Sequence, residues 1–230
     1  MHNESLISTK NLLKQYPVGN SKFTALKNID LKIESGEFTG LVGPSGSGKT
    51  TLLNILGALD MPSNGEAIVL DQNIGQLSHK EAAQLRNMHF GFIFQTYNLL
   101  PVYTVYENVE FPLLLQKKSR LEIDRMVKQA LEWVGLTDKI KSRPAQLSGG
   151  ECQRVAIARA MVKEPKIVYA DEPTANLDAE NSHNVLKTML QLNQEIETTF
   201  LFATHDEKVI TYLKRKISLN DGKVVKDEKF

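Results

Sequence analysis

The sequence predicts an α/β fold with a parallel sheet at its core. Two observations carry this prediction. Short apolar strands alternate with helical segments along the chain, which is typical of parallel α/β domains. In addition, an apolar strand, a glycine-rich loop and a helix follow one another within residues 38–56, which is the setting of a phosphate-binding loop.

The first third of the chain begins with β structure. Ile29, Leu31 and Ile33 alternate with polar residues, and residues 34–37 have the composition of a turn. A strand is then expected at 38–42. The helix that follows the glycine-rich loop should start near residue 50 and end at Gly57.

Later elements follow the same alternation. Ser119 and Glu122 are spaced as a capping box for a helix that Gly135 should end. The stretch 96–160 is mostly helical in pattern and resembles an inserted subdomain. The remaining expected elements are strands at 90–94, 167–170, 200–203 and near 224, and helices at 151–162 and from 179 onward.

Length and charge limit the possible functions. The chain has 230 residues, of which 41% are hydrophobic, so it suits one domain spanning 1–230. Its formal charge is +1, without the strongly basic balance that nucleic-acid binding favours. We therefore expect no nucleic-acid partner.

The chain carries one cysteine and no long apolar segment. Cys152 is alone and cannot form an internal disulfide, which suits a reducing compartment. Residues 1–5 have neither a basic nor an apolar character of the kind a signal peptide needs. Apolar runs fall far short of the ~20 residues of a spanning helix. We expect any membrane role to come through a partner.

The glycine-rich loop fits the Walker A pattern. Glycines let backbone N–H groups turn toward phosphates, and the following helix adds its positive N-terminal end. Lys49 is expected to reach the β- and γ-phosphates, and the Thr50 hydroxyl to bind Mg²⁺. The alternative is a glycine-rich turn that binds nothing. The expected binding residues are Gly43, Pro44, Ser45, Gly46, Ser47, Gly48, Lys49, Thr50 and Thr51.

An apolar strand at 167–170 leads into two carboxylates. Asp171 would lie at the carboxyl end of the strand, near the metal, as the Walker B acid. Glu172 could polarise the attacking water. The alternative is an ordinary charged turn after a core strand.

Residues 147–151 open a helix and have two interpretations. Ser148 and Glu151 are spaced as a capping box, which is a purely structural feature. Gly149 and Gly150 would instead present bare N–H groups to a phosphate, and a capping box does not require paired glycines there. The excess of glycine favours anion binding.

Four further residues are weak candidates when each is taken alone. Gln95 and His205 each follow an apolar strand, Tyr16 precedes a proline, and Asp178 precedes a helix. Tyr16 could be a packing aromatic, and Asp178 only an N-cap. His205 could be a solvated residue beside a helix that Thr204 caps, with Glu207 completing the box.

The order of these motifs makes the chain similar to the ATP-binding cassette family over nearly its whole length. The sequence Leu-Ser-Gly-Gly at 147–150, upstream of the Walker B strand, is specific to that family. The resemblance implies a RecA-like P-loop core, an antiparallel β subdomain and a helical subdomain at roughly 96–160.

The resemblance also implies roles for residues. Such domains pair head to tail, and each ATP lies between the Walker A loop of one copy and Ser148, Gly149, Gly150 and Glu151 of the other. Tyr16 would stack on adenine, Glu172 would be the catalytic base, His205 would hold the γ-phosphate, and Asp178 would communicate across the dimer. Lys49 would assist catalysis. The implied metal ligands are Thr50, Gln95 and Asp171, and the implied cofactors are ATP and Mg²⁺.

Within the family, several segments resemble the lipoprotein-releasing ATPases and the MacB-type efflux pumps. These segments are 57–62, 85–87, 91–95, 98–101 and 107–109, whereas 104–109 is also similar to a cell-division ATPase. The implied partners are integral membrane transporter subunits, and the implied location is the cytoplasmic side of a bacterial inner membrane. Glu151, Cys152 and Ala175 depart from the commonest family residues, but none removes an implied ligand.

Overall fold

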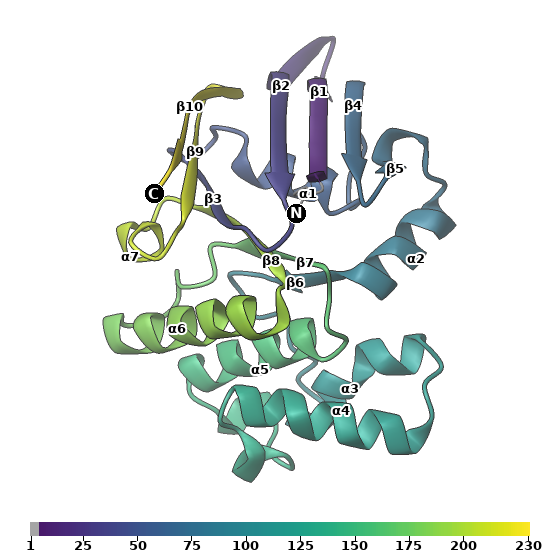
Figure 1. Cartoon of the computed structure of the whole chain (residues 1–230), viewed down its shortest axis with the longest axis vertical. Coiled ribbons are helices and arrows are strands. Elements are labelled where there is room, and N and C mark those ends of the chain that lie inside the picture. Colours follow the sequence, from purple (N-terminus) through teal and green to yellow (C-terminus); the bar gives the residue numbers. More distant parts are fainter. Residues whose placement is uncertain (1–4) are drawn as a thin grey trace.

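The computed structural model describes residues 5–230, which form two β-sheets and a helical layer (Figure 1). The strands are β1 (Ser5–Val18), β2 (Ser21–Glu34), β3 (Phe38–Val42), β4 (Asn64–Val69), β5 (Gln72–Asn73), β6 (Phe90–Ile93), β7 (Ile167–Asp171), β8 (Thr199–Thr204), β9 (Arg215–Asn220) and β10 (Lys223–Lys229).

The larger sheet is the predicted parallel core. Its strand order is β10-β9-β3-β8-β7-β6, and every neighbouring pair is parallel except β9 with β10. Strands β3, β7 and β8 are buried over nearly their whole length because the sheet is covered on both faces. The expected strands at 38–42, 90–94, 167–170 and 200–203 are confirmed to within a residue or two.

The smaller sheet is antiparallel and lies at the opposite end from the helices α3 to α5 (Figure 1). Its order is β2-β1-β4-β5, and β1 and β2 form a long hairpin. Alternate residues of β2 are buried, as the sequence pattern predicts for a half-covered strand. An antiparallel β subdomain therefore accompanies the parallel core, as expected.

The helices are α1 (Lys49–Leu56), α2 (His79–His89), α3 (Val105–Leu115), α4 (Arg120–Trp133), α5 (Gly149–Met161), α6 (Ala179–Ile196) and the single turn α7 (Glu207–Ile210). Short 3₁₀ turns lie at Ile74–Gln76, Thr137–Lys139 and Pro144–Gln146. The capping box of Ser119 and Glu122 starts α4, and Gly57 caps the end of α1, both as predicted.

Two local features differ from the sequence-based expectation. Helix α2 was not predicted, because it buries only Ala82 and Leu85. Helix α3 lies within the stretch 96–160 that was predicted to be mostly helical, although its bounds were not given. The N-cap of α7 is Asp206, whose side chain accepts a hydrogen bond from the Lys208 N–H. The suggested cap by Thr204 is therefore wrong, since Thr204 is the last residue of β8.

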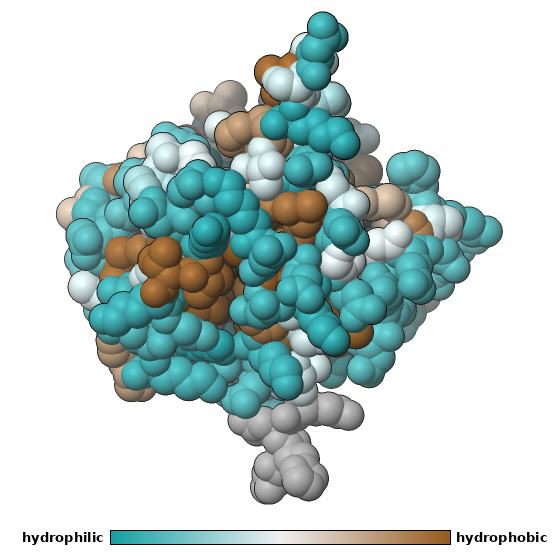
Figure 2. All heavy atoms as spheres, turned by 90° about the horizontal axis from the view of Figure 1, so that it is seen from above, coloured by the Kyte–Doolittle hydropathy of each residue, from teal (hydrophilic) through white to brown (hydrophobic). Residues whose placement is uncertain are grey.

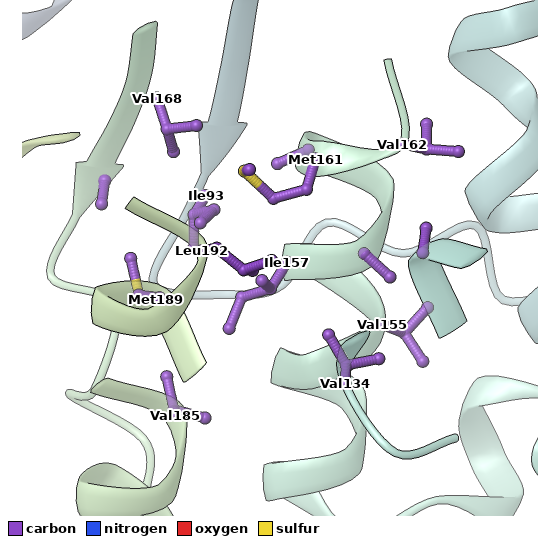
Figure 3. Close-up of a cluster of buried hydrophobic side chains, with 14 of the residues drawn as sticks. Ile93, Val134, Val155, Ile157, Met161, Val162, Val168, Val185, Met189 and Leu192 are labelled. Atoms are coloured by element: carbon purple, nitrogen blue, oxygen red, sulfur yellow. The ribbon is translucent and has the colours of Figure 1, made fainter. Parts of the chain in front are cut away.

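Helices α5 and α6 pack against one face of the parallel sheet. Figure 3 shows Ile157 and Met161 of α5 beside Ile93 of β6, Val168 of β7 and Leu192 of α6. All of these side chains are essentially fully buried. Close packing of this kind holds α5 against the sheet as a rigid element.

The face of the molecule in Figure 2 is mostly hydrophilic, and hydrophobic side chains gather there in a few separate patches. Within residues 5–230, none of the helices combines the length and the apolar character that crossing a membrane requires.

A partly buried ion network joins β9 to β10 and to the connection between β2 and β3. The guanidinium of Arg215, on β9, donates to both carboxylate oxygens of Asp227 at 2.8 and 2.7 Å. It also donates to Glu37 at 2.9 Å and to the Lys32 carbonyl at 2.8 Å. Arg215 is only 8% exposed, and the Glu37 side chain is 13% exposed, so water has little access to replace this pair.

We expect Arg215→Met to destabilise the chain by about 3 kcal/mol, because Glu37 would stay buried after losing its main cationic partner. The free energy of unfolding in urea measures this effect. Lys27→Met is the matched control, since the Lys27–Asp221 pair at 2.6 Å has an Asp221 side chain that is 82% exposed. The control should cost less than about 1 kcal/mol. An equal loss of unfolding free energy in both variants would contradict a stabilising role specific to the Arg215 network.

Candidate nucleotide-binding site

The glycine-rich loop lies between β3 and the first turn of α1. Gly48, the residue before α1, has φ of 100°, and a Cβ there would lie 2.8 Å from the Ala25 carbonyl oxygen. Only glycine meets both conditions without strain. The loop therefore opens α1 with unobstructed N–H groups at its positive end, which is an anion-binding arrangement.

Lys49 is held inside this loop. Its ammonium donates to the carbonyl oxygens of Gly43 at 2.7 Å and Pro44 at 3.0 Å, and the residue is 7% exposed. Backbone carbonyls are only partial negative charges. The cation is therefore available for stronger pairing with phosphate oxygens close to the loop.

Two further side chains meet beside Lys49. The Thr50 hydroxyl donates to Asp171 Oδ1 at 3.1 Å. Burial raises the pKa of Asp171 above its usual value, and the charge of neighbouring Glu172 adds to the rise. The Thr50 hydrogen bond and the Lys49 charge act in the opposite direction and only partly offset it.

Glu172 is fixed at both carboxylate oxygens. Its Oε1 lies 2.6 Å from His205 Nδ1, and its Oε2 accepts from the Thr204 hydroxyl at 3.0 Å. Glu172 has φ of 45°, a left-handed conformation that turns the chain sharply after β7. Its side chain is 15% exposed and that of His205 62% exposed, so the pair lies at the edge of the site.

These groups surround one hollow of about 480 Å³. It brings together most of the sequence-predicted residues from the Walker A loop, the Walker B strand, Gln95 and His205. The predicted residues in its wall are Ser45, Gly46, Gly48, Lys49, Thr50, Thr51, Gln95, Asp171, Glu172 and His205.

The sequence did not predict Phe23, Ala25 and Ala175, which also line the hollow. Phe23 is 56% exposed and lies directly opposite Tyr16 across the β1–β2 hairpin. An aromatic residue left exposed beside a phosphate loop is a usable signal, but recognising it required the register of the hairpin.

Tyr16 does not line the hollow. Its hydroxyl donates to Asp60 Oδ2 at 2.8 Å, and the Lys14 ammonium lies 4.8 Å from its ring centroid. Gly43, Pro44 and Ser47 also lie outside the wall and form the base of the loop. The Ser47 Oγ is buried without a hydrogen-bond partner among the described residues.

The 148–151 segment and Asp178 lie outside the hollow that the Walker A loop lines. Ser148 and Glu151 form a reciprocal capping box at the start of α5, and Asp178 caps α6, but none of them lines the hollow. A Cβ on Gly150 would lie 2.3 Å from Asn181 Oδ1. Gly150 therefore has a packing reason as well as the proposed anion-binding one.

The donors beside the loop suit a hard divalent cation. Mg²⁺ is usually bound through one or two protein oxygens together with substrate phosphates and water. Thr50 and Asp171 supply a hydroxyl and a carboxylate in contact, and Gln95 adds an amide at the same hollow. Among the described residues, no group of three or more His, Cys, Asp or Glu side chains could hold a metal by itself.

A phosphate loop on a parallel sheet, facing an acidic strand end, defines a P-loop nucleoside triphosphatase. Residues 26–175 match the family described as ABC transporter, and the chain belongs to that family. It is an ATP-hydrolysing ATP-binding cassette.

Relatives of known name and solved structures agree with this assignment. The chain is 44% identical over 225 residues to the "Lipoprotein-releasing system ATP-binding protein LolD" of Idiomarina loihiensis, covering 98% of this chain and 99% of that protein. It resembles the ATP-binding cassette MJ0796, solved as a dimer with ADP and Pi, with a TM-score of 0.89 and 40% identity over 97% and 98% of the chains. CbiO1 of Clostridium perfringens has a TM-score of 0.88 and 30% identity, covering 98% and 88%.

The raised pKa of Asp171 gives a stability prediction. A raised folded-state pKa means that ionised Asp171 destabilises the fold. Stability is therefore lost as the pH rises from about the ordinary value of 3.8 through the folded-state pKa. Without nucleotide, Asp171→Asn should raise Tm at pH 7, and the gain should shrink as the pH falls into that range.

Asp60→Asn is the matched control, because the pKa of Asp60 is shifted in the opposite direction, below its usual value. Burial alone would raise the pKa of Asp60, but hydrogen bonds from Lys14, Tyr16 and the Met61 N–H outweigh it and lower the pKa. This substitution should lower Tm at pH 7. An Asp171→Asn protein with a lower Tm than the unaltered chain at pH 7 would contradict the prediction.

Proposed function

We propose that this chain powers a membrane complex that releases lipoproteins from a bacterial inner membrane. The observation that carries the proposal is 44% identity over almost the full length to a protein named LolD, a lipoprotein-releasing ATP-binding protein. In this proposal the chain lies on the cytoplasmic side of the membrane and is attached through integral membrane subunits.

The phosphate loop binds the triphosphate. Its backbone N–H groups and the Lys49 ammonium neutralise the β- and γ-phosphates, and the loop carbonyls that now hold Lys49 release it to them. Thr50, Asp171 and Gln95 are the proposed ligands of Mg²⁺, which when bound neutralises charge on the phosphate oxygens. Phe23 and Tyr16 lie on one face of the hairpin beside the loop and offer aromatic surface to the base.

Glu172 is proposed to orient the attacking water and accept its proton. Its two hydrogen bonds fix the carboxylate at the edge of the hollow, so little reorganisation is needed when water attacks in line. His205 uses Nδ1 to contact Glu172. Its Nε2 is left for the γ-phosphate, and a protonated ring can donate from both nitrogens.

A second copy would complete the site. Ser148 and Gly149 are exposed at the positive end of α5 yet lie outside the hollow of their own chain. In a head-to-tail pair they would bind the phosphates held by the partner's loop, and Glu151 and Asp178 would border the same interface. The dimeric solved structures of MJ0796 support this arrangement.

We expect Glu172→Gln to lower kcat for ATP hydrolysis by about 100-fold or more, because the amide cannot accept the proton. ATP affinity should stay within a few-fold, since the phosphate contacts remain. Steady-state phosphate release and equilibrium binding of a fluorescent ATP analogue measure the two quantities. Glu195→Gln, an exposed carboxylate on α6, should leave both unchanged. A Glu172→Gln enzyme with near-normal turnover would disprove the role.

A groove between the parallel sheet and α3 is the proposed contact for the membrane subunit. Its volume is about 270 Å³, and its lining residues are Phe90, Gly91, Phe92, Phe94, Asn98, Phe111, Pro112, Arg159, Ala160 and Lys163. Burial lowers the pKa of Lys163 to about 8, and its ammonium is held by the backbone carbonyls of Arg86 and Asn87. An apolar segment carrying one acidic side chain would suit this groove.

The partner is identified by purifying Glu172→Gln with ATP and Mg²⁺ from detergent-solubilised membranes, followed by mass spectrometry. We expect a membrane protein with few spans and a large domain outside the cytoplasm. Adding Phe111→Arg should reduce its recovery several-fold. Leu121→Arg, at a residue that is 83% exposed and outside the groove, should not. Recovery of ribosomal or DNA-associated proteins alone would refute the transporter role.

A further inference from the structure

Gln153 is a buried polar side chain that the proposed reaction does not use. It lies on α5, one turn after the Ser148–Gly150 segment, and is 0% exposed. Its amide Nε2 donates to the Pro173 carbonyl oxygen at 2.6 Å. Among residues 5–230 its Oε1 has no hydrogen-bond partner. An unpartnered buried acceptor costs about 1–3 kcal/mol, so a simple packing role would favour an apolar side chain here.

The carbonyl that Gln153 holds belongs to the residue after Glu172. The first residues of the loop that begins at Glu172 are otherwise held from the opposite side, by the end of β8 and the start of α7. Glu172 N–H donates to the Ala203 carbonyl at 2.9 Å, and the Thr174 hydroxyl donates to Asp206 at 3.0 Å. Gln153 therefore links α5 to this loop, by a hydrogen bond to the residue directly after Glu172.

The N-terminus of α5, one turn before Gln153, carries the proposed phosphate contacts of the second copy. Gln153 follows Ser148 by five residues, about 7.5 Å along a helix axis. The buried side chains of α5 hold the helix against β6, β7 and α6, so its first turn and Gln153 move together (Figure 3). A displacement of Ser148 and Gly149 is thus transmitted to the Pro173 carbonyl.

We propose that Gln153 is a positioning residue that couples the two ATP sites of a dimer. The inference rests on the proposed head-to-tail dimer. In that dimer the N-terminus of α5 contacts the ATP held by the partner's loop, whereas Glu172 of the same chain acts on the ATP held by its own loop. Phosphate bound at the N-terminus of α5 shifts the helix, and the Gln153–Pro173 hydrogen bond passes this shift to the loop that carries Glu172. Closure of one site thereby prepares the other, which makes hydrolysis cooperative in ATP.

The test is Gln153→Met, which keeps the volume of the side chain and removes the donor. In ATPase assays on the full chain, we expect kcat to fall about tenfold and KM to change less than twofold. The Hill coefficient for ATP should fall from near 2 in the unaltered chain to about 1. A merely structural role would not change the Hill coefficient.

Gln116→Met is the matched control. It removes the same kind of bond, from Gln116 Nε2 to the Asn87 carbonyl at 2.9 Å, at the C-cap of α3 and outside the nucleotide-binding hollow. Its Hill coefficient should match that of the unaltered chain. A Gln153→Met chain with an unchanged Hill coefficient overturns the proposal, and so does an unaltered chain with a coefficient of 1. An unaltered chain that hydrolyses no ATP refutes the proposed function instead.

If Gln153→Met does not fold, Gln153→Glu serves as a second variant of the same shape, and the same loss of cooperativity is expected. Hydrogen exchange of the unaltered chain tests the proposal without substitution. ATP should slow the exchange of backbone amides at 149–152 and at 174–177, and both segments should become protected over the same range of ATP concentration. Protection of the two segments at clearly different ATP concentrations overturns the coupling.

Discussion

The carboxyl ends of three adjacent parallel strands, β3, β8 and β7, make the rest of the site possible. In the register of the sheet, Val42 lies opposite Thr204, and Asp171 lies opposite Ala203. The loops that follow these strands therefore leave the sheet at one edge. The contacts Thr50–Asp171 and Glu172–Thr204 each join the segment that follows one strand to the end of another. Buried strands of matched length fix these positions before any ligand contributes.

The same convergence crowds like charges. Asp171 and Glu172 are consecutive carboxylates at a partly buried strand end, and the pKa of Asp171 is raised by its burial and by the charge of Glu172. A fold selected for stability alone would place apolar or neutral residues there. Lys49 and Thr50 only partly offset the cost, so a divalent cation bound beside Asp171 would relieve the repulsion between the two carboxylates.

The sequence predicted the parts of the site that are local in the chain. The Walker A loop, the Asp171–Glu172 pair and the capping box of Ser148 need only a strand or helix boundary, which apolar periodicity and glycine locate. It could not predict contacts set by distant pairing. Phe23 reaches the hollow through the hairpin register, and Tyr16 is bound by Asp60, 44 residues away. Helix α2 was missed because it packs little apolar surface.

Gly150 shows why a motif alone does not settle its own purpose. The sequence suggested anion binding because a capping box does not require glycine, but Asn181 occupies the space where a Cβ would lie. Asn181 also holds Asp178, through its backbone N–H at 2.8 Å and its amide at 2.7 Å. One glycine therefore lets α5 approach α6 closely and leaves the first turn of α5 unobstructed. Gly150 thus takes part both in the surface that would face a second copy and in the packing against Asn181. Because Asn181 holds Asp178, a change at Gly150 would affect that surface and the orientation of Asp178 together.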